Sequence, residues 1–295
     1  MSRFQEIRRQ YTLPQLLAIL ITSLGLFHGS STCAAVDWPP IAPEDLALTA
    51  VSQQPGAPAV ILLHEETADD PNNNHSVYMR VKVLTEAGRK YADVEIPYSR
   101  SDFTISDVSG RTVHADGSIV PFEGKPFDKV AVRTKGSHSL RIHLKSFTLP
   151  DVQLGSILDY RYSYRYGDRV FYPPEWILQD ELFQEREVFK FIPYVGDLQL
   201  EHGRIGNGIA WSAFVPKDHP PMLHNVPRTS LASARQSSEW VDLEMTSVPA
   251  VVEEPFMPPR DTLAYRVQFY YTLNSKTEDY WKEEGKYWSK EVEGF

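Results

Sequence analysis

The sequence has 295 residues, of which 42% are hydrophobic and 23% are charged. A chain of this length forms one large domain or two ordinary ones, and the composition is typical of a globular protein. Its 30 basic and 39 acidic side chains give a formal charge of −9. Because nucleic acids and anionic membranes are bound by cationic surfaces, this charge argues against either as a partner.

The first 35 residues have the pattern of a secretory signal peptide. Arg3, Arg8 and Arg9 precede an apolar run from Leu16 to Phe27, and small residues follow at 29–35. Export signals share this order. The run has 12 residues, whereas a membrane-spanning helix needs about 20. We therefore expect an exported chain, periplasmic or extracellular, with no transmembrane span after cleavage. An uncleaved membrane anchor is the alternative.

Cleavage near Ala35 would change the formal charge from −9 to −11 and would remove Cys33, the only cysteine. Without a thiol, the mature chain has no disulfide, no thiolate zinc site and no cysteine nucleophile. In a minor alternative, Cys33 is the lipidated residue of a lipoprotein. The preceding Ser30-Ser31-Thr32 lacks the aliphatic residue that such a signal usually carries.

Most of the chain from Ala57 to Leu273 alternates apolar and polar residues, which is the pattern of strands that bury one face. In Val77–Val83 the odd-numbered residues are apolar. We expect a half-buried strand there, with Arg80 and Lys82 on its other face. Leu158–Tyr166 alternates over the longest stretch. Further strands are expected at Tyr91–Ile96, Val130–Arg133, Leu140–Lys145, Val188–Ile192, Ile209–Phe214 and Tyr265–Leu273.

Turn residues separate these strands, as at Asp116-Gly117 and Gly206-Asn207-Gly208. Many short strands at this spacing predict an all-β fold over residues 36–273, an antiparallel β-sandwich that is large or double. Proline clusters such as Pro173-Pro174 and Pro255–Pro259 are expected in long connections, because proline cannot donate to a strand ladder. The sequence contains no internal repeat and no glycine-rich phosphate loop.

Residues 274–295 change pattern and predict a C-terminal helix. Ser275–Glu278 has the spacing of a capping box. Apolar side chains then recur on one stripe, at Tyr280, Trp281, Tyr287, Trp288 and Val292. Such a stripe packs either on the chain's own sheet or on another domain or chain. We interpret this tail as a truncated linker to a missing domain.

The segment from about His64 to Tyr194 resembles a bacterial domain of unknown function that occurs ahead of transglutaminase-like domains in exported proteins. The matching motifs are Val81–Gly88, Ile96-Pro97-Tyr98, Val113–Val120, Phe147–Val152, Gly155–Tyr162 and, downstream, Glu254–Pro259. These motifs are mostly strands and turns, so the resemblance implies a β-sandwich module to which no catalytic role is assigned. In the family a Cys-His-Asp domain normally follows, and this sequence ends where that domain would start.

Candidate catalytic and metal-binding residues lack the required spacing. No Gly-x-Ser-x-Gly elbow accompanies the serines. His138 and His143 are five residues apart, so on one strand their rings face opposite sides. His219 and His224 have the same spacing. Asp69–Asn74 lacks the ordered alternation of a calcium-binding loop and is interpreted as a polar loop.

Adjacent carboxylates occur at Glu65-Glu66, Glu253-Glu254 and Glu283-Glu284. Neighbours on a strand point to opposite faces, so these pairs do not establish the separation that a glycosidase needs. We therefore expect no catalytic residue, no metal and no cofactor.

The leading hypothesis is a non-enzymatic exported module that positions or contacts a partner, namely a transglutaminase-like domain, another chain or a surface polymer. The expected contact residues are aromatic: Tyr172, Trp176, Trp281, Tyr287 and Trp288. The first two lie in a proline-stiffened loop able to stack on a sugar, and core packing is the alternative for their rings. Two further hypotheses stay open. One is the front part of a transglutaminase-like peptidase or crosslinking system whose catalytic domain is supplied elsewhere. The other is a carbohydrate-binding module.

Overall fold

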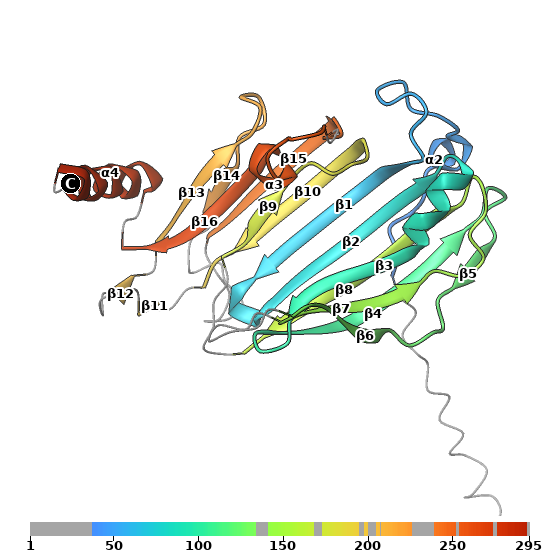
Figure 1. The fold of residues 1–295 in the computed structure, drawn as a ribbon, viewed down its shortest axis with the longest axis horizontal. Coiled ribbons are helices and arrows are strands. Elements are labelled where there is room, and N and C mark those ends of the chain that lie inside the picture. The colour runs from blue at the N-terminus through green and yellow to red at the C-terminus, as the bar shows by residue number, and fades with distance from the viewer. Residues whose placement is uncertain are drawn as a thin grey trace, which may run out of the picture. The chain divides into compact units, whose positions relative to one another are not determined.

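The computed structural model describes residues 37–133, 141–167, 173–194, 198–199, 205–206, 208–225, 239–251, 254–273 and 276–293. The chain divides into two compact units, Met1–Pro40 and Ile41–Phe295. In the first unit only residues 37–40 are described, and they form neither helix nor strand. The predicted signal peptide and Cys33 lie outside the described residues. All the regular structure described below belongs to the second unit (Figure 1).

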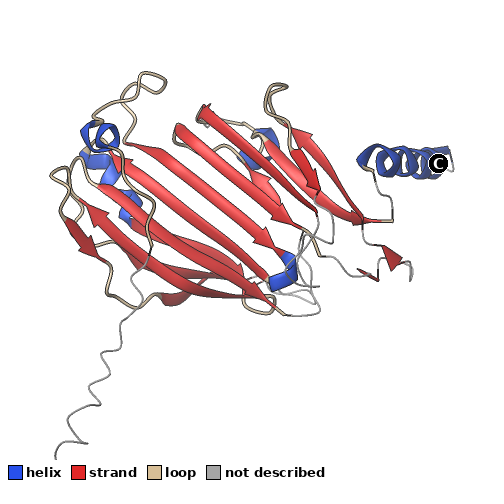
Figure 2. Ribbon diagram, turned by 180° about the vertical axis from the view of Figure 1, so that it is seen from behind, coloured by secondary structure: helices blue, strands red, loops and turns tan. Residues whose placement is uncertain are grey.

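An eight-stranded sheet forms the base of the second unit. Its strands are β1 (Ala59–Asp69), β2 (Asn74–Val83), β4 (Phe103–Val113), β5 (Ile119–Pro121), β8 (Ile157–Tyr166), β10 (Gln184–Ile192), β14 (Met222–Asn225) and β15 (Glu239–Val248). Their order across the sheet is β14-β15-β10-β1-β2-β8-β4-β5. Neighbours run antiparallel except β1 and β10, which are parallel. Figure 2 shows the long strands of this sheet from behind.

Two three-stranded antiparallel sheets accompany the large one. The first small sheet has the order β3-β7-β6, with β3 (Asp93–Ser99), β6 (Phe127–Arg133) and β7 (Arg141–Thr148). The second small sheet has the order β13-β16-β9, with β9 (Glu175–Ile177), β13 (Gly208–Phe214) and β16 (Arg266–Thr272). A further short pair joins β11 (Leu198–Gln199) and β12 (Ile205–Gly206).

Short helices connect these strands. They are α2 (Pro43–Ala47), α3 (Arg260–Leu263) and the 3-10 turns η1 (Asp70–Asn72) and η2 (Glu86–Ala92). The long helix α4 (Thr277–Glu293) begins inside the predicted capping box. Among the described residues, no helix has the length and hydropathy needed to cross a membrane.

Both small sheets pack on the same face of the large sheet, as the strand register shows. Glu66 on β1 pairs with Val77 on one side and with Phe189 on the other, so all three face the same way. Under the first small sheet, Ile61, Val81 and Leu158 pack with Val94, Ile96 and Phe147. Under the second small sheet, Phe189, Phe191 and Leu243 pack with Trp176, Val267 and Phe269. The expected sandwich is therefore confirmed, with two small sheets sharing one large one.

The opposite face of the large sheet is also covered, and this corrects the expectation of a half-buried strand at β2. Arg80 is buried, and its Nε donates to Asp159 Oδ1 at 2.8 Å. Tyr78 donates to the same oxygen at 2.9 Å, and Arg111 Nε donates to Oδ2 at 2.9 Å. The Asp159 carboxylate on β8 thus accepts hydrogen bonds from three buried side chains on β2 and β4, the strands on either side of it.

Lys82 is buried on the same face. Its ammonium donates to the carbonyls of Leu46 and Gly155, each at 2.7 Å. The segment that contains α2 lies against this face, with Leu46 and Leu48 packed on a cluster that includes Val60 and Ile157. The polar residues that alternate along β2 therefore face buried polar partners and not water.

The parallel pairing of β1 with β10 was not expected, and the strands β1, β4, β9, β14 and β15 were not predicted. β1 carries apolar residues on consecutive positions over Ala59–Leu63, because both of its faces are buried. Such a run has no period of two, so the sequence pattern does not distinguish this strand from a buried helix.

The Asp159 cluster generates a stability prediction. Asp159→Asn leaves Arg80 and Arg111 without their buried counter-charge and should lower the free energy of unfolding by about 3–5 kcal/mol. Asp107→Asn is the matched control, because Asp107 pairs with Arg165 at the surface, where ion pairs contribute less than about 1 kcal/mol. Urea unfolding of both variants measures the difference. Equal losses in the two would contradict the assigned role of Asp159.

Candidate functional site

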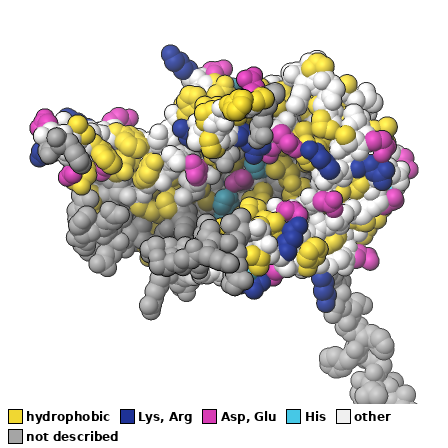
Figure 3. Space-filling model, in the orientation of Figure 1, with side chains coloured by type: hydrophobic (Ala, Val, Ile, Leu, Met, Phe, Trp, Pro, Cys, Tyr) yellow, Lys and Arg dark blue, Asp and Glu magenta, His cyan; other side chains and the backbone are white. Residues whose placement is uncertain are grey.

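A groove crosses the face of the large sheet between the two small sheets. It consists of two adjoining pockets of about 320 Å³ and about 340 Å³, and Tyr162 lines both. Figure 3 shows a hollow in this face, with histidine and acidic side chains at its floor. The structure therefore places a recess where neither small sheet covers the centre of the large one.

Tyrosines from β8 form much of the groove floor. Tyr160 and Tyr162 line the first pocket, and Tyr162 and Tyr164 line the second. Burial raises the pKa of all three phenols, that of Tyr164 to about 12. They are consequently neutral at physiological pH and offer ring faces together with hydroxyl groups. The Tyr164 hydroxyl donates to the carbonyl of Pro97 at 3.2 Å.

The walls of the groove come from the edges of the small sheets. Among the described strands, β3 pairs only with β7, and β9 pairs only with β16. β3 lines both pockets along its length, from Asp93 to Ser99. Across the second pocket stand Pro173, Pro174 and Glu175 at the start of β9. The groove is thus bordered by two sheet edges.

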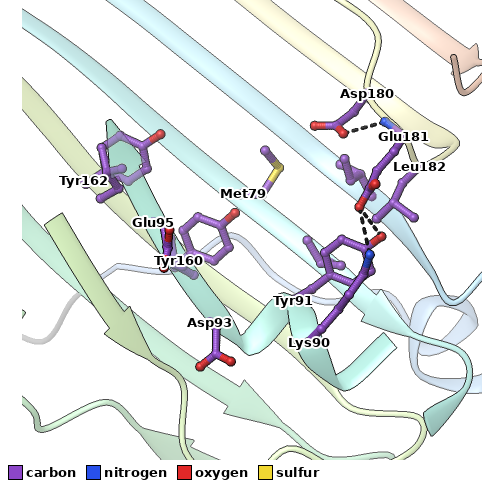
Figure 4. A pocket seen from close by; sticks show the side chains of 14 residues that line it. Met79, Lys90, Tyr91, Asp93, Glu95, Tyr160, Tyr162, Asp180, Glu181 and Leu182 are labelled. Atoms are coloured by element: carbon purple, nitrogen blue, oxygen red, sulfur yellow. Dashed lines mark hydrogen bonds and ion pairs between the residues drawn. The ribbon is translucent and has the colours of Figure 1, made fainter. Parts of the chain in front are cut away.

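The first pocket has an acidic lining. Asp93, Glu95, Asp180 and Glu181 line it together with one ammonium, Lys90. In Figure 4, Met79 and Tyr160 lie among these side chains, and Tyr91 and Lys90 reach toward Glu181. The Glu181 Oε1 atom accepts from Tyr91 at 2.6 Å and from Lys90 at 3.3 Å. Asp180 is paired with Arg260, and Glu95 with Lys129. The pocket therefore keeps a small net negative charge, which favours a positively charged ligand.

A cluster of two histidines and two glutamates lies at the floor of the second pocket, which Glu66 and His75 line. Nε2 of His64 lies 2.9 Å from Glu66 Oε1, and Nε2 of His75 lies 2.8 Å from Glu66 Oε2. Glu187 of β10 is fully buried, with Oε1 at 3.8 Å from His64 Nδ1. At this distance the two side chains form an ion pair but no hydrogen bond. Neither oxygen of Glu187 accepts a hydrogen bond among the described residues.

The cluster shifts the protonation of its members. Burial opposes a charge on His64, but its interactions with Glu187 and Glu66 prevail and raise its pKa to about 10. Burial likewise opposes the charge on Glu66, and hydrogen bonds from His64 and His75 outweigh it, so the Glu66 pKa falls well below its usual range. For Glu187, burial dominates and raises the pKa to about 7. At neutral pH, His64 is therefore an imidazolium bound to an ionised Glu66.

The described residues contain no group of three or more His, Cys, Asp or Glu side chains arranged to hold a metal ion. In the central cluster, each oxygen of Glu66 is engaged by an imidazole. The oxygen-rich segment Asp69–Asn74 is likewise engaged in bonds within the chain. Asp69 accepts from the backbone of Asn72, and the buried Asp70 accepts from the hydroxyls of Tyr166 and Tyr271. Asp70 thereby joins the large sheet to the second small sheet.

The structure disperses the aromatic residues predicted as partner contacts. Tyr172 lies outside the described residues. Trp176 has no exposed surface, and its ring lies 4.7 Å from that of Phe269 and 5.5 Å from that of Phe189. The prediction that Trp176 contacts a partner is therefore wrong. The short strand β9 turns this ring into the core between the two sheets, as the packing alternative held.

The three aromatic residues predicted on the helix lie on α4. Trp281 is partly anchored, since its Nε1 donates to the carbonyl of Trp211 at 2.8 Å and its ring meets Tyr270 edge-on. Tyr287 and Trp288 are 58% and 63% exposed. None of the three lines either pocket of the groove.

Sequence reasoning missed the central cluster entirely. Glu66 was considered only with its neighbour Glu65, which points to the other face of the strand. The signal available was the spacing of His64 and Glu66, two residues apart and hence on one face of a strand. His75 and Glu187 join them only through the pairing of β1 with β2 and β10.

The raised pKa of Glu187 predicts a pH dependence of stability. The Glu187 carboxyl binds its proton more tightly in the folded chain than in the unfolded chain. Its contribution to stability is therefore fully present below pH 4.5 and is lost as the pH rises to about 7. His64 acts in the same direction between pH 6.5 and about 10. Between pH 5 and pH 8, Glu187→Gln should therefore gain stability relative to the wild-type chain, by up to about 3 kcal/mol.

Urea unfolding at both pH values measures this difference. Glu244→Gln is the control, because Glu244 forms a surface ion pair with Arg186 and should follow the wild-type pH profile. The assignment fails if Glu187→Gln and the wild-type chain lose the same free energy over this range.

Comparison with known proteins matches part of the chain to a family and to a solved structure. Residues 71–197 match DUF3857, a Domain of Unknown Function with a solved structure. No curated protein matches the chain. The crystal structure of a putative protease from Parabacteroides distasonis ATCC 8503 shares the fold, with a TM-score of 0.54 and 14% sequence identity. The alignment covers 72% of this chain and 40% of that one. The strands from β2 to β10 therefore belong to the part of the chain that matches DUF3857.

Proposed function

We propose that this chain is a non-enzymatic binding module that holds a segment of a partner in the groove. The observation that carries the proposal is the groove itself, a recess with a floor of neutral tyrosines and walls made of two sheet edges. Binding sites in proteins are typically concave, with aromatic surfaces and a few placed polar groups. Here the polar groups include Glu66, His75 and the carboxylates around Lys90.

The bonding of these polar groups supports recognition over catalysis. A nucleophilic mechanism needs a hydroxyl or thiol within reach of a base. Ser99, the one serine among the described lining residues, has its Oγ at 2.8 Å from Ser101 Oγ. The central imidazoles are bound to Glu66. Such a network presents a fixed charge pattern to a ligand.

We further propose that the module is accessory to a transglutaminase-like domain. The sequence resemblance of His64–Tyr194 supports this association. The alignment with the structural neighbour covers 72% of this chain and 40% of that one, so the neighbour is long enough to hold a further domain. Export is part of the same proposal and rests on the arginines and the apolar run within residues 1–35. Mass spectrometry of the secreted protein should find its first residue near Val36.

The aromatic face of α4 supports a second contact surface. Tyr287 and Trp288 are largely exposed beside the anchored Trp281. Exposed rings of this size are typical of contact surfaces. We assign ligand binding to the groove and not to α4, because the groove combines a recess, a charge pattern and aromatic rings.

A comparison of two tyrosine variants tests this assignment. The probes are a lysine-rich peptide and a soluble N-acetylglucosamine hexamer, titrated into the full chain by calorimetry. At least one probe should bind, and Tyr162→Ala should weaken its binding about tenfold or more, because truncation of a central aromatic contact residue typically costs about 2 kcal/mol or more. Tyr287→Ala, the matched control on α4, should leave the affinity within about twofold.

Three outcomes would contradict the proposal. The first is that neither probe binds, and the second is binding that Tyr162→Ala leaves unchanged. The third is incorporation of a fluorescent primary amine into casein by this chain alone, abolished by a change in the groove. If Tyr162→Ala does not fold, Ser99→Trp fills the second pocket from the edge of β3 and replaces it in the test.

A further inference from the structure

We infer that the occupant of the groove is an extended, basic polypeptide segment that adds to the free edge of β3 as a further strand. The inference rests on the proposed function, since it takes the groove as the binding site, and it names the class of ligand. Three features support it: the backbone of β3, the floor beneath that edge and the charges around it.

The outward edge of β3 is identified by its ladder with β7. The N–H of Leu149 donates to the carbonyl of Ala92 at 3.0 Å. In an antiparallel ladder such bonded pairs recur at every second residue, and the β3–β7 register has no shift. Val94, Ile96 and Tyr98 therefore turn their backbone groups toward β7. The residues between them, Asp93, Glu95 and Pro97, turn theirs toward the groove.

Pro97 supports this assignment in two ways. Proline is found in strands where its missing N–H faces away from a partner, which is the outward direction here. Its carbonyl also accepts the bond from Tyr164, a residue of the groove floor. The outward carbonyl of Pro97 therefore points into the groove.

The remaining outward groups fit an added strand. The N–H of Asp93 is used, because it donates to the carbonyl of Lys90. The carbonyl of Asp93 and both the N–H and carbonyl of Glu95 have no strand partner among the described residues. They offer two acceptors and one donor in the spacing of a β-ladder. Strand addition to a sheet edge uses such main-chain groups for affinity and alternate side chains for specificity.

The floor of the groove matches the side-chain alternation of an added strand. β3 has seven residues, which span about 23 Å at ~3.3 Å per residue. Along this length the two pockets follow one another, with Tyr162 common to both. Every second side chain of a bound segment would point toward the tyrosines, and the others toward solvent.

Charge selects a basic segment. Four carboxylates line the first pocket, and three of them, Glu95, Asp180 and Glu181, are paired with Lys129, Arg260 and Lys90. The fourth, Asp93, forms no ion pair among the described residues, so one negative charge stays unbalanced. Glu66, Glu175 and His75 line the second pocket, and Glu66 is itself neutralised by the imidazolium of His64. Lysine or arginine side chains gain from this excess of carboxylates and from the tyrosine faces, which attract cations. A neutral glycan would use the rings but neither the charge nor the ladder spacing of the edge.

The experiment uses the full chain and a nine-residue peptide of alternating lysine and valine, acetylated and amidated. Its affinity should exceed that of the counterpart with glutamate in place of lysine by about tenfold or more. Both Glu95→Pro and Glu95→Ala remove the carboxylate and its ion pair with Lys129. Glu95→Pro also removes the outward N–H, whereas Glu95→Ala keeps it. Glu95→Pro should weaken binding about tenfold more than Glu95→Ala, the effect of one lost main-chain bond.

Modified peptides keep the test valid if Glu95→Pro fails to fold. Two versions of the probe carry N-methyl groups on either the odd or the even residues. One version should bind about tenfold more weakly than the parent, since one set of amides faces β3. Equal affinities for both versions and the parent would overturn strand addition, as would equal affinities of Glu95→Pro and Glu95→Ala.

The outcomes also separate this inference from the proposed function. If the N-acetylglucosamine hexamer binds and Tyr162→Ala abolishes its binding, while the basic peptide does not bind, the groove is a binding site and the inference is wrong. If neither probe binds, both are wrong. Preference for the glutamate peptide would overturn the assignment of a basic ligand.

Discussion

The charged centre of β1 determines how the rest of this protein is arranged. β1 lies under the first small sheet at Ile61 and under the second at Ala68, and between them it carries His64 and Glu66. Ionised groups in a protein interior are costly unless they are paired and bonded. Here they are paired with each other and with His75, and Glu187 completes the cluster. Apolar sheets pack on the two ends of the strand, and the polar middle forms the floor of the groove.

The opposite face of the large sheet gives this arrangement its rigidity. Asp159 binds Tyr78, Arg80 and Arg111 across adjacent strands, and Lys82 bonds two carbonyls of covering segments. These contacts bury the outer faces of β2 and β8. The inner faces of the same strands present the tyrosines. A floor fixed from behind is the condition for a preorganised binding surface, which loses little conformational freedom when a ligand binds.

Parts of the fold could be predicted because their pattern is local. β8 alternates over its whole length, and α4 begins within its predicted capping box, so both were found. The buried charges at Arg80 and Lys82 could not be found, since a polar residue that faces a buried carboxylate and one that faces water look alike in sequence. Trp176 was misassigned because proline-rich surroundings indicate a loop, while the pairing of β9 with β16 turns the ring inward.

The candidate site depends even more on tertiary pairing. His64 and Glu66 belong to β1, whose apolar run hid the strand period. Glu187 reaches them through the parallel pair β1–β10, which no local pattern indicates. The free edge of β3 left one trace in the sequence, Pro97, whose missing donor is tolerated where no strand follows. That trace becomes informative only once the ladder with β7 is known.

The free edge of β3 is tested most directly by amide hydrogen exchange, residue by residue, with and without the lysine-valine peptide. In the free chain, the amides of Val94 and Ile96 should exchange slowly because they are bonded to β7, and the amide of Glu95 should exchange fast. Saturation with the peptide should slow exchange at Glu95 and leave its two neighbours unchanged. A Glu95 amide that is protected in the free chain, or that stays unprotected with bound peptide, would contradict the account.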